Sequence, residues 1–222
     1  MSNSEEFIPY QKRDQTEQEM LERSSSYYRL MNERRSIRMF SDRDVPFEVI
    51  EYIVKTAGTA PSGAHKQPWT FCIVRSTDLK AKIRQAAEEE EYKSYNGRMS
   101  ETWLKDLEPF GTNWQKPFLE TVPWIIVVFK RAYELEEGNK HQNYFVNESV
   151  GIACGMLISA IHHVGLATLT HTPSPMNFLT QLLERPENER PYLLLPVGYP
   201  ADDAKVPDLA RKGFDEIAVV YD

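Results

Sequence analysis

The chain has 222 residues, of which 41% are hydrophobic and 27% charged, and its formal net charge is -7. This length allows one domain with a substantial core, and the composition is ordinary for a globular protein. The acidic balance argues against nucleic acid as a partner, because nucleic-acid binding calls for a basic face. No stretch approaches the roughly 20 apolar residues of a membrane helix, and the polar N-terminus lacks a signal-peptide core. We therefore expect a cytoplasmic protein that binds neither membrane nor nucleic acid.

The first half of the chain contains mainly helical patterns. Residues 1–14 are predicted to form a flexible arm, followed by a polar helix over residues 15–33. A second helix is predicted over residues 46–57, where apolar side chains recur at helical spacing after Pro46. Residues 69–75 are β-branched and aromatic, which is typical of a strand. The charged segment 78–116 is predicted to be helical in two or three pieces.

The second half contains the most apolar segments. Residues 122–130 are apolar on both faces, so we expect them to form a central strand. Residues 143–164 form a predicted helix that is apolar nearly all round, which indicates burial in the core or at a subunit interface. The remaining predicted elements are a strand over 166–170, a helix over 175–184, and strands over 192–197 and 216–221. Few strands and several long helices predict a single α+β sandwich over residues 15–222.

The two cysteines do not suggest a reactive site. Cys72 lies in a strand-like run and Cys154 in an apolar helical run, so both are expected to be buried apolar side chains. Two cysteines make a disulfide framework or a zinc site implausible. We expect no metal site and no chemistry that uses a nucleophilic thiol.

Two motifs flank the helix predicted over residues 46–57. Residues 34–38 read Arg-Arg-Ser-Ile-Arg, and the fixed forks of donors on arginine match the oxygens of a phosphate. Residues 61–64 read Pro-Ser-Gly-Ala, and at Gly63 the backbone can approach a flat ligand closely. The arginines alone would more often form a basic surface segment. Their combination with the small-residue loop indicates a nucleotide or flavin site.

Together with later segments, these motifs resemble the flavin-dependent nitroreductase superfamily and, within it, the iodotyrosine deiodinases. The segments are residues 56–65, 68–71, 112–114, 195–200 and 206–209. The resemblance covers roughly residues 28–220. It implies a nitroreductase-like α-β-α sandwich, in which helices flank a central, mostly antiparallel sheet, and a domain-swapped homodimer with FMN at the subunit interface. Animal deiodinases of this family carry an N-terminal membrane anchor, and we expect none in this protein.

The resemblance assigns a set of residues to FMN. The phosphate and ribityl end would be held by Arg34, Arg35, Ser36, Ile37 and Arg38, with Arg211 closing on it. Ser62 and Gly63 would border the isoalloxazine ring. Without the family pattern, Arg211 would be interpreted as a surface charge.

The resemblance also places a catalytic residue after the strand predicted over 166–170. Thr170 would direct its hydroxyl at the flavin N5, because a hydrogen bond there favours one-electron steps. His171 and Thr172 are neighbouring cofactor-site positions. His171 stands where the family commonly has Thr, so it receives no separate role. Without the family pattern, residues 169–173 would be an ordinary turn at a strand end.

Three further residues match the deiodinase pattern, which ordinary nitroreductases lack: Glu91, Tyr95 and Lys116. Glu91 and Tyr95 are four apart and hence neighbours on one helical face. By themselves they would be part of a solvated charged helix. A carboxylate, a phenol and an ammonium suit an amino-acid zwitterion, with Glu91 on its ammonium and the other two on its carboxylate. The resemblance adds the backbone N–H of Ala64 as donor to the phenolate oxygen of a halotyrosine.

The resemblance implies an FMN enzyme that reductively removes halide from 3-halotyrosines (iodotyrosine, also bromo- and chlorotyrosine) and releases tyrosine. A lid over about residues 88–118 would close on the substrate and exclude water. Electrons would come from NAD(P)H or from an unidentified reductase. Two alternatives remain open: a general NAD(P)H-dependent nitroreductase or quinone reductase, and a non-catalytic protein that binds flavin or halotyrosine.

Overall fold

The computed structural model describes residues 7–221, which divide into two compact units, one ending at Arg34 and the other beginning at Arg35. Residues 1–6 of the predicted arm and Asp222 lie outside the described residues. Residues 7–15 form neither helix nor strand, and α1 (Glu17–Glu33) follows them. Thr16 begins this helix in a capping box: its Oγ1 accepts from the Glu19 N–H at 3.3 Å, and its own N–H donates to Glu19 Oε2 at 2.8 Å. No residue of α1 is buried within the described chain.

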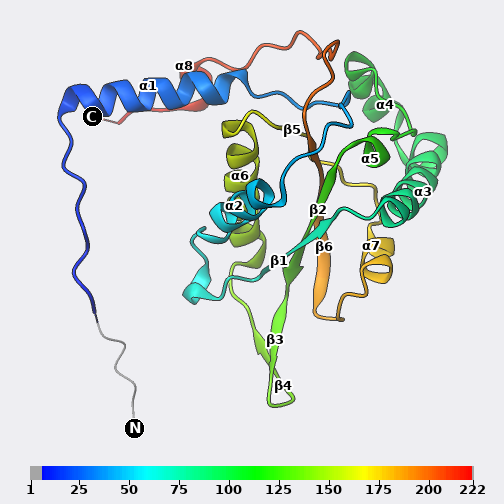
Figure 1. The fold of residues 1–222 in the computed structure, drawn as a ribbon, viewed down its shortest axis with the longest axis horizontal. Helices are drawn as coiled ribbons and strands as arrows, with labels where there is room; N and C mark the ends of the chain where they lie inside the picture. The colour runs from blue at the N-terminus through cyan, green and yellow to red at the C-terminus, as the bar shows by residue number, and fades with distance from the viewer. Residues whose placement is uncertain (1–6, 222) are drawn as a thin grey trace. The chain divides into compact units, whose positions relative to one another are not determined.

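The second unit is built around a four-stranded sheet in the order β1-β2-β6-β5 (Figure 1). Its strands are β1 (Trp69–Val74), β2 (Trp124–Arg131), β5 (Ala167–Thr168) and β6 (Glu189–Gly198). Every neighbouring pair is antiparallel. The predicted fold class is therefore confirmed, and the strand predicted over residues 122–130 is central, as β2 between β1 and β6. Among the described residues, no helix has the length and apolar content to cross a membrane.

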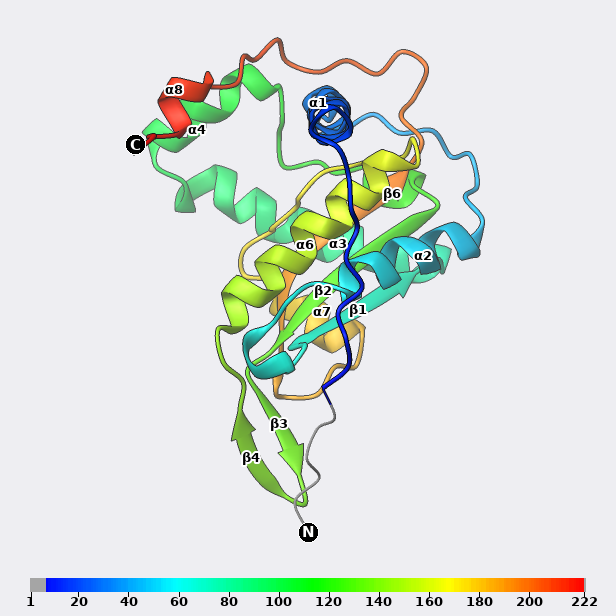
Figure 2. The same ribbon diagram turned by 90° about the vertical axis from the view of Figure 1, so that its left-hand side faces the viewer.

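Side chains of β2 alternate between two hydrophobic cores, because successive residues of a strand point to opposite faces of the sheet. Ile126 and Val128 pack with α2 (Phe47–Gly58) and α6 (Val146–His163). Ile125, Val127 and Phe129 pack on the other face with α3 (Thr77–Lys93), α5 (Phe118–Thr121) and α7 (Asn177–Leu182). Figures 1 and 2 show these helices as layers on either side of the sheet.

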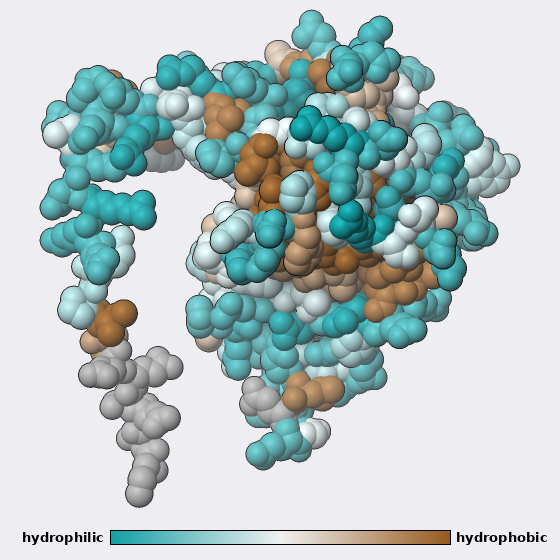
Figure 3. Space-filling view, viewed as in Figure 1, coloured by the Kyte–Doolittle hydropathy of each residue, from teal (hydrophilic) through white to brown (hydrophobic). Residues whose placement is uncertain are grey.

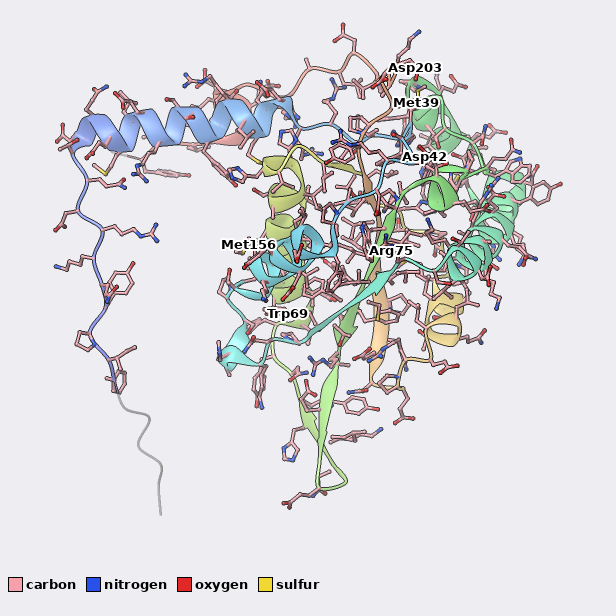
Figure 4. The ribbon with its side chains drawn as sticks, viewed as in Figure 1. Met39, Asp42, Trp69, Arg75, Met156 and Asp203 are labelled. Carbon is pink, nitrogen blue, oxygen red and sulfur yellow. The ribbon has the colours of Figure 1, made fainter. Side chains whose placement is uncertain are left out.

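Side chains anchor the edge strand β1 at both ends. Trp69 begins the strand, and Met156 of α6 packs against the same core (Figure 4). Arg75 follows the last residue of β1 and lies 5.1 Å from the ring centre of Trp124, with an ion pair to Asp44 at 2.9 Å.

The predicted helical character of residues 78–116 is confirmed, with breaks that the sequence did not indicate. After α3 come a π-helical turn, η2 (Ser94–Arg98), and then α4 (Glu101–Leu107) and the 3₁₀ turn η3 (Glu108–Phe110). The Met99 N–H donates to the Ser94 carbonyl at 2.9 Å. This i to i+5 bond defines a π turn, which often occurs at functional sites.

Two parts of the second unit differ from prediction. A hairpin of β3 (Tyr133–Glu136) and β4 (Asn139–Gln142) extends away from the sheet (Figures 1 and 2) and was not predicted, because its sequence is mostly polar. The strand predicted over residues 216–221 was wrong. The chain instead forms α8 (Phe214–Ile217), whose first turn is closed by the Gly213 N–H donating to Glu216 Oε2 at 2.8 Å. Within residues 7–221, no strand pairs with this tail.

Candidate functional site

A cavity of about 420 Å³ lies on the α3 face of the sheet. It collects many of the residues predicted for cofactor and substrate: Arg38, Glu91, Tyr95, Lys116, Thr170, His171 and Thr172. Apolar side chains form much of the remaining wall: Met99, Trp103, Leu107, Phe118, Leu169 and Met176. These apolar residues were not predicted, because nothing in the sequence distinguishes them from ordinary core residues.

Glu91 and Tyr95 reach the cavity from different kinds of helix. Glu91 lies near the C-terminal end of α3, whereas Tyr95 lies in the π-helical turn η2. The backbone angles depart from helical values only at Asn96 and Gly97, after Tyr95, so the two residues remain neighbours one turn apart, as predicted. The cavity brings the two side chains together.

A buried ion pair joins Glu91 to Lys116. The distance from Lys116 Nζ to Glu91 Oε2 is 3.4 Å, and the two residues are 4% and 9% exposed, respectively. Lys116 Nζ also donates to the Asn113 carbonyl and, at 3.3 Å, to Thr112 Oγ1. Burial raises the pKa of Glu91 and lowers that of Lys116, while the charge of each opposes the shift of the other. Both charged groups are thus shielded from bulk water and line the cavity, so a charged ligand bound there could form ion pairs with them.

Arg38 adds a second positive charge to the cavity. Residue 36 forms a parallel bridge with Thr168, and the Ile37 N–H donates to the Thr168 carbonyl at 3.2 Å, so this segment runs beside β5. Arg38 is half-buried, its pKa is lowered by burial, and it lies 5.8 Å from the ring centre of Phe110. It has no carboxylate partner within residues 7–221. Two cations against one carboxylate make the cavity suitable for an anion such as a phosphate or a phenolate.

The other predicted cofactor arginines do not line this cavity. Arg35 is half-buried, and its guanidinium donates to the Pro207 carbonyl, which fixes it to the segment 206–209. Arg211 is exposed in a stretch without helix or strand. Arg34 follows the last residue of α1 and belongs to the first unit, so it is not placed with the others.

The predicted flavin loop lies beside α6, and its Ser62, Gly63 and Ala64 do not line the described cavity. Ser62 Oγ accepts from the Gln67 N–H at 2.9 Å, and the Gly63 N–H donates to Ser149 Oγ of α6 at 3.4 Å. A Cβ on Gly63 would lie 2.8 Å from the Tyr144 carbonyl oxygen. Packing against the chain at residue 144 therefore requires this glycine, a reason that the sequence did not indicate.

Ala64 has an unusual backbone conformation. Its φ is 48°, and φ is also positive at His65 (55°) and Gln67 (46°). Non-glycine residues in this region are strained, and such strain is concentrated at functional sites. Within the described chain, the Ala64 N–H has no hydrogen-bond acceptor. The loop thus presents one unused donor in a fixed geometry.

The surroundings of the two cysteines do not favour the thiolate form. Cys72 and Cys154 are free, and burial raises the pKa of both, that of Cys154 to about 12. Within residues 7–221, no group of three or more His, Cys, Asp or Glu side chains could hold a metal ion.

One contact that the sequence did not reveal links the two sides of the cavity. Arg98 of η2 forms an ion pair with Glu90 at 2.6 Å and donates to the Ser174 carbonyl at 3.0 Å. The second contact joins residues 76 positions apart, and no local sequence pattern predicts such a pair.

Comparisons with known proteins identify the family of this chain. The nitroreductase family model matches residues 31–199. An iodotyrosine deiodinase of Haliscomenobacter hydrossis is 61% identical over 222 residues, 100% of both chains. Human iodotyrosine deiodinase 1 is 47% identical over 216 residues, 96% of this chain and 75% of the human protein. A crystal structure of oxidized iodotyrosine deiodinase bound to FMN and 3-iodo-L-tyrosine matches with a TM-score of 0.75 and 32% identity, covering 88% of this chain and 98% of that one. This chain therefore belongs to the nitroreductase family and, within it, to the iodotyrosine deiodinases.

Proposed function

We propose that this protein is an FMN-dependent oxidoreductase that reductively removes halide from 3-halotyrosines and releases tyrosine. The observation that carries this proposal is the cavity in which Glu91, Tyr95 and Lys116 lie together with Arg38 and Thr170. Its relatives named as iodotyrosine deiodinases, one of them with FMN and 3-iodo-L-tyrosine bound, support the same activity. When bound, FMN supplies the electrons for cleavage of the carbon–halogen bond.

The charges of the cavity fit the amino-acid end of the substrate. Lys116 and Glu91 form a buried pair at 3.4 Å, and separating buried charges is costly unless each finds a new partner. A zwitterion meets this need, because its ammonium can bind Glu91 while its carboxylate binds Lys116 and Tyr95. A halophenol without these groups cannot replace the pair, so the site should select halogenated amino acids over simple halophenols.

Arg38 and Thr170 are suited to the cofactor and to the reacting end. The Arg38 guanidinium, together with Arg34, Arg35, Ser36, Ile37 and Arg211, would hold FMN. Thr170 is exposed in the cavity wall, and within the described chain its hydroxyl has no hydrogen-bond partner. This free donor fits the flavin N5, with His171 and Thr172 beside it. The unused N–H of Ala64 fits a phenolate oxygen.

A homodimer accounts for the separation of the flavin loop from the cavity. Residues 62–64 lie beside α6, whereas the cavity lies on the α3 face, so one chain alone does not assemble all the predicted residues. Large hydrophobic side chains are exposed at or beside α2 and α6: Phe47, Phe145, Ile152 and Val164. Hydrophobic residues also gather over the α2 region in the space-filling view (Figure 3). We propose that a second copy covers this surface and contributes its loop to the site.

We further propose that residues 15–222 act as one FMN-binding domain in which the segment 88–118 is a lid. This segment contributes Glu91, Tyr95 and Lys116 to the cavity. It is connected to the opposite wall by the hydrogen bond that Arg98 donates to the Ser174 carbonyl. Closure would place the three side chains around the substrate and exclude water. The electron donor would be NAD(P)H or a separate reductase, and the cytoplasm remains the expected location.

The test compares ligand binding in wild type, Glu91→Gln and Lys116→Met by quenching of flavin fluorescence. Removing one member of a desolvated charge pair costs about 2–5 kcal/mol, so iodotyrosine should bind roughly 30-fold or more weakly to both variants. Iodophenol should bind poorly to wild type and change little. Glu89→Gln, an exposed acid on the same helix, is the matched control and should leave both affinities unchanged.

The outcome also separates the alternatives. Equal losses of affinity for iodotyrosine and iodophenol would mean that the Glu91–Lys116 ion pair only supports the fold. No loss for either, with reduced protein that converts nitroaromatics but releases no iodide from iodotyrosine, would identify a general nitroreductase. Tight iodotyrosine binding without iodide release from the reduced protein would identify a binding protein.

A further inference from the structure

The cavity contains one buried imidazole to which the proposed reaction gives no task. His171 is 6% exposed. Its backbone is held by β6, because its N–H donates to the Leu194 carbonyl at 2.9 Å and its carbonyl accepts from the Leu194 N–H at 3.0 Å. The imidazole plane lies at 83° to the ring plane of Phe118, with the ring centroids 6.0 Å apart. Sheet and aromatic contact together fix the position of the imidazole.

The imidazole lies next to the carboxylate of the proposed ammonium site. Its Nδ1 is 4.0 Å from Glu91 Oε1, while the other oxygen, Oε2, is 3.4 Å from Lys116 Nζ. The carboxylate thus has the lysine on one side and the histidine on the other. The remaining charged or titratable groups at the cavity are Tyr95 from η2 and Arg38 from the segment beside β5.

The second ring nitrogen argues against a purely structural histidine. Nε2 is buried and has no hydrogen-bond partner among residues 7–221. A buried polar atom without a partner is destabilising, and its presence in a native structure calls for an explanation. A histidine that serves the core alone would bridge two partners, whereas this ring has Glu91 Oε1 at 4.0 Å from Nδ1 and no partner for Nε2 among the described residues. Burial, together with the charges of Lys116 and Arg38, lowers the pKa of His171 to about 3, so the ring is neutral and carries one N–H.

We infer that His171 is a positioning residue that directs its imidazole N–H at Glu91 and keeps this carboxylate ionised and oriented for the substrate ammonium. The inference rests on the proposed function. When the substrate carboxylate takes Lys116, Glu91 loses its lysine partner on Oε2. The imidazole on the Oε1 side then stabilises the negative charge until the ammonium is seated. No covalent or redox step is involved, and the proton stays on the imidazole.

The test measures the pH dependence of iodotyrosine binding to the FMN-loaded protein. Protonation of Glu91 abolishes its attraction for an ammonium, so affinity falls as the pH drops through the pKa of Glu91. Removal of the imidazole donor should raise this pKa further. In His171→Leu, the acid limb of binding should therefore begin about one pH unit higher, which corresponds to roughly tenfold weaker binding at the acid end. His171→Asn keeps an N–H donor at the Nδ1 position and should restore the wild-type limb.

Iodophenol binding, measured with FMN at saturating concentration, separates this role from a structural one, since it does not depend on Glu91. It should be unchanged in His171→Leu. His171→Ala gives the same comparison if the leucine variant does not retain FMN. An unchanged acid limb in a variant that holds FMN, or equal losses for both ligands, would overturn the inference. If Glu91→Gln itself leaves iodotyrosine binding and its pH limb intact, then the proposed zwitterion site fails, and the role of His171 fails with it.

Discussion

The buried imidazole of His171 should make the stability of this protein depend on pH in a defined window. Burial and the nearby cations lower its pKa from 6.5 to about 3 in the folded state. The unfolded chain therefore binds a proton here between pH 6.5 and 3, whereas the folded chain does not. Protons then favour the unfolded state, so stability is fully present above pH 6.5 and is lost as the pH falls toward 3.

The magnitude follows from the two pKa values. Between pH 7 and pH 5, this single group should lower the free energy of unfolding by about 2 kcal/mol. For a chain of this size, such a change corresponds to a decrease in Tm of about 4–8 °C. Other groups also titrate in this range, so the quantity to compare is the difference between wild type and a variant.

The assay is denaturant unfolding at pH 7 and pH 5 for wild type, His171→Leu and His163→Gln. Between pH 7 and pH 5, the free energy of unfolding of the leucine variant should fall by about 2 kcal/mol less than that of wild type. His163 is exposed at the end of α6, and its variant should keep the wild-type loss. If His171→Leu loses as much stability between the two pH values as wild type does, the imidazole is not held neutral by the folded chain, and the reasoning is refuted.

Two further predictions follow from positions described above. Gly63→Ala should lower the free energy of unfolding by about 1–3 kcal/mol in a denaturant titration, because its Cβ would lie 2.8 Å from a carbonyl oxygen. Gly58→Ala is the control: no atom lies within 4 Å of its new Cβ, so it should be neutral or stabilising in the same titration. Thr170→Ala should keep FMN but lower the ratio of iodide release to nitroaromatic reduction, since its hydroxyl is the proposed donor to N5; a ratio that falls only in Thr172→Ala would move that role to Thr172.

The layers of the fold could be predicted because apolar patterns are local. Residues 122–130 are apolar on both faces, and this alone places β2 between two cores. The hairpin of β3 and β4 could not be predicted, because its pairing depends on a turn and on polar strands without an apolar face. The strand predicted over residues 216–221 was wrong because the apolar residues of this tail resemble a strand in sequence. A strand also requires a neighbouring strand to pair with, and a sequence pattern does not show whether one is available.

The site could be predicted residue by residue only through the family resemblance. The spacing of Glu91 and Tyr95 suggested a helical face, yet the π turn that begins at Ser94 and includes Tyr95 depends on backbone geometry that has no simple sequence signal. The burial of Glu91 and Lys116 could not be predicted from the sequence either, since a run of acidic residues is usually exposed to solvent. The placement of Arg38 in the cavity follows from its segment pairing with Thr168, a contact between distant parts of the chain.

The alternation of β2 has a consequence for how the protein can vary. Each residue of this strand belongs to one core only, so neighbouring positions are constrained by different parts of the molecule. A change of volume at Val127 is transmitted to the core that contains Phe118 and Leu169, which are also walls of the cavity. The same change at Ile126 reaches α2 and α6 instead. Tolerance to substitution along β2 should therefore alternate with a period of two, with one set of positions affecting the cavity and the other affecting the packing of α2 and α6.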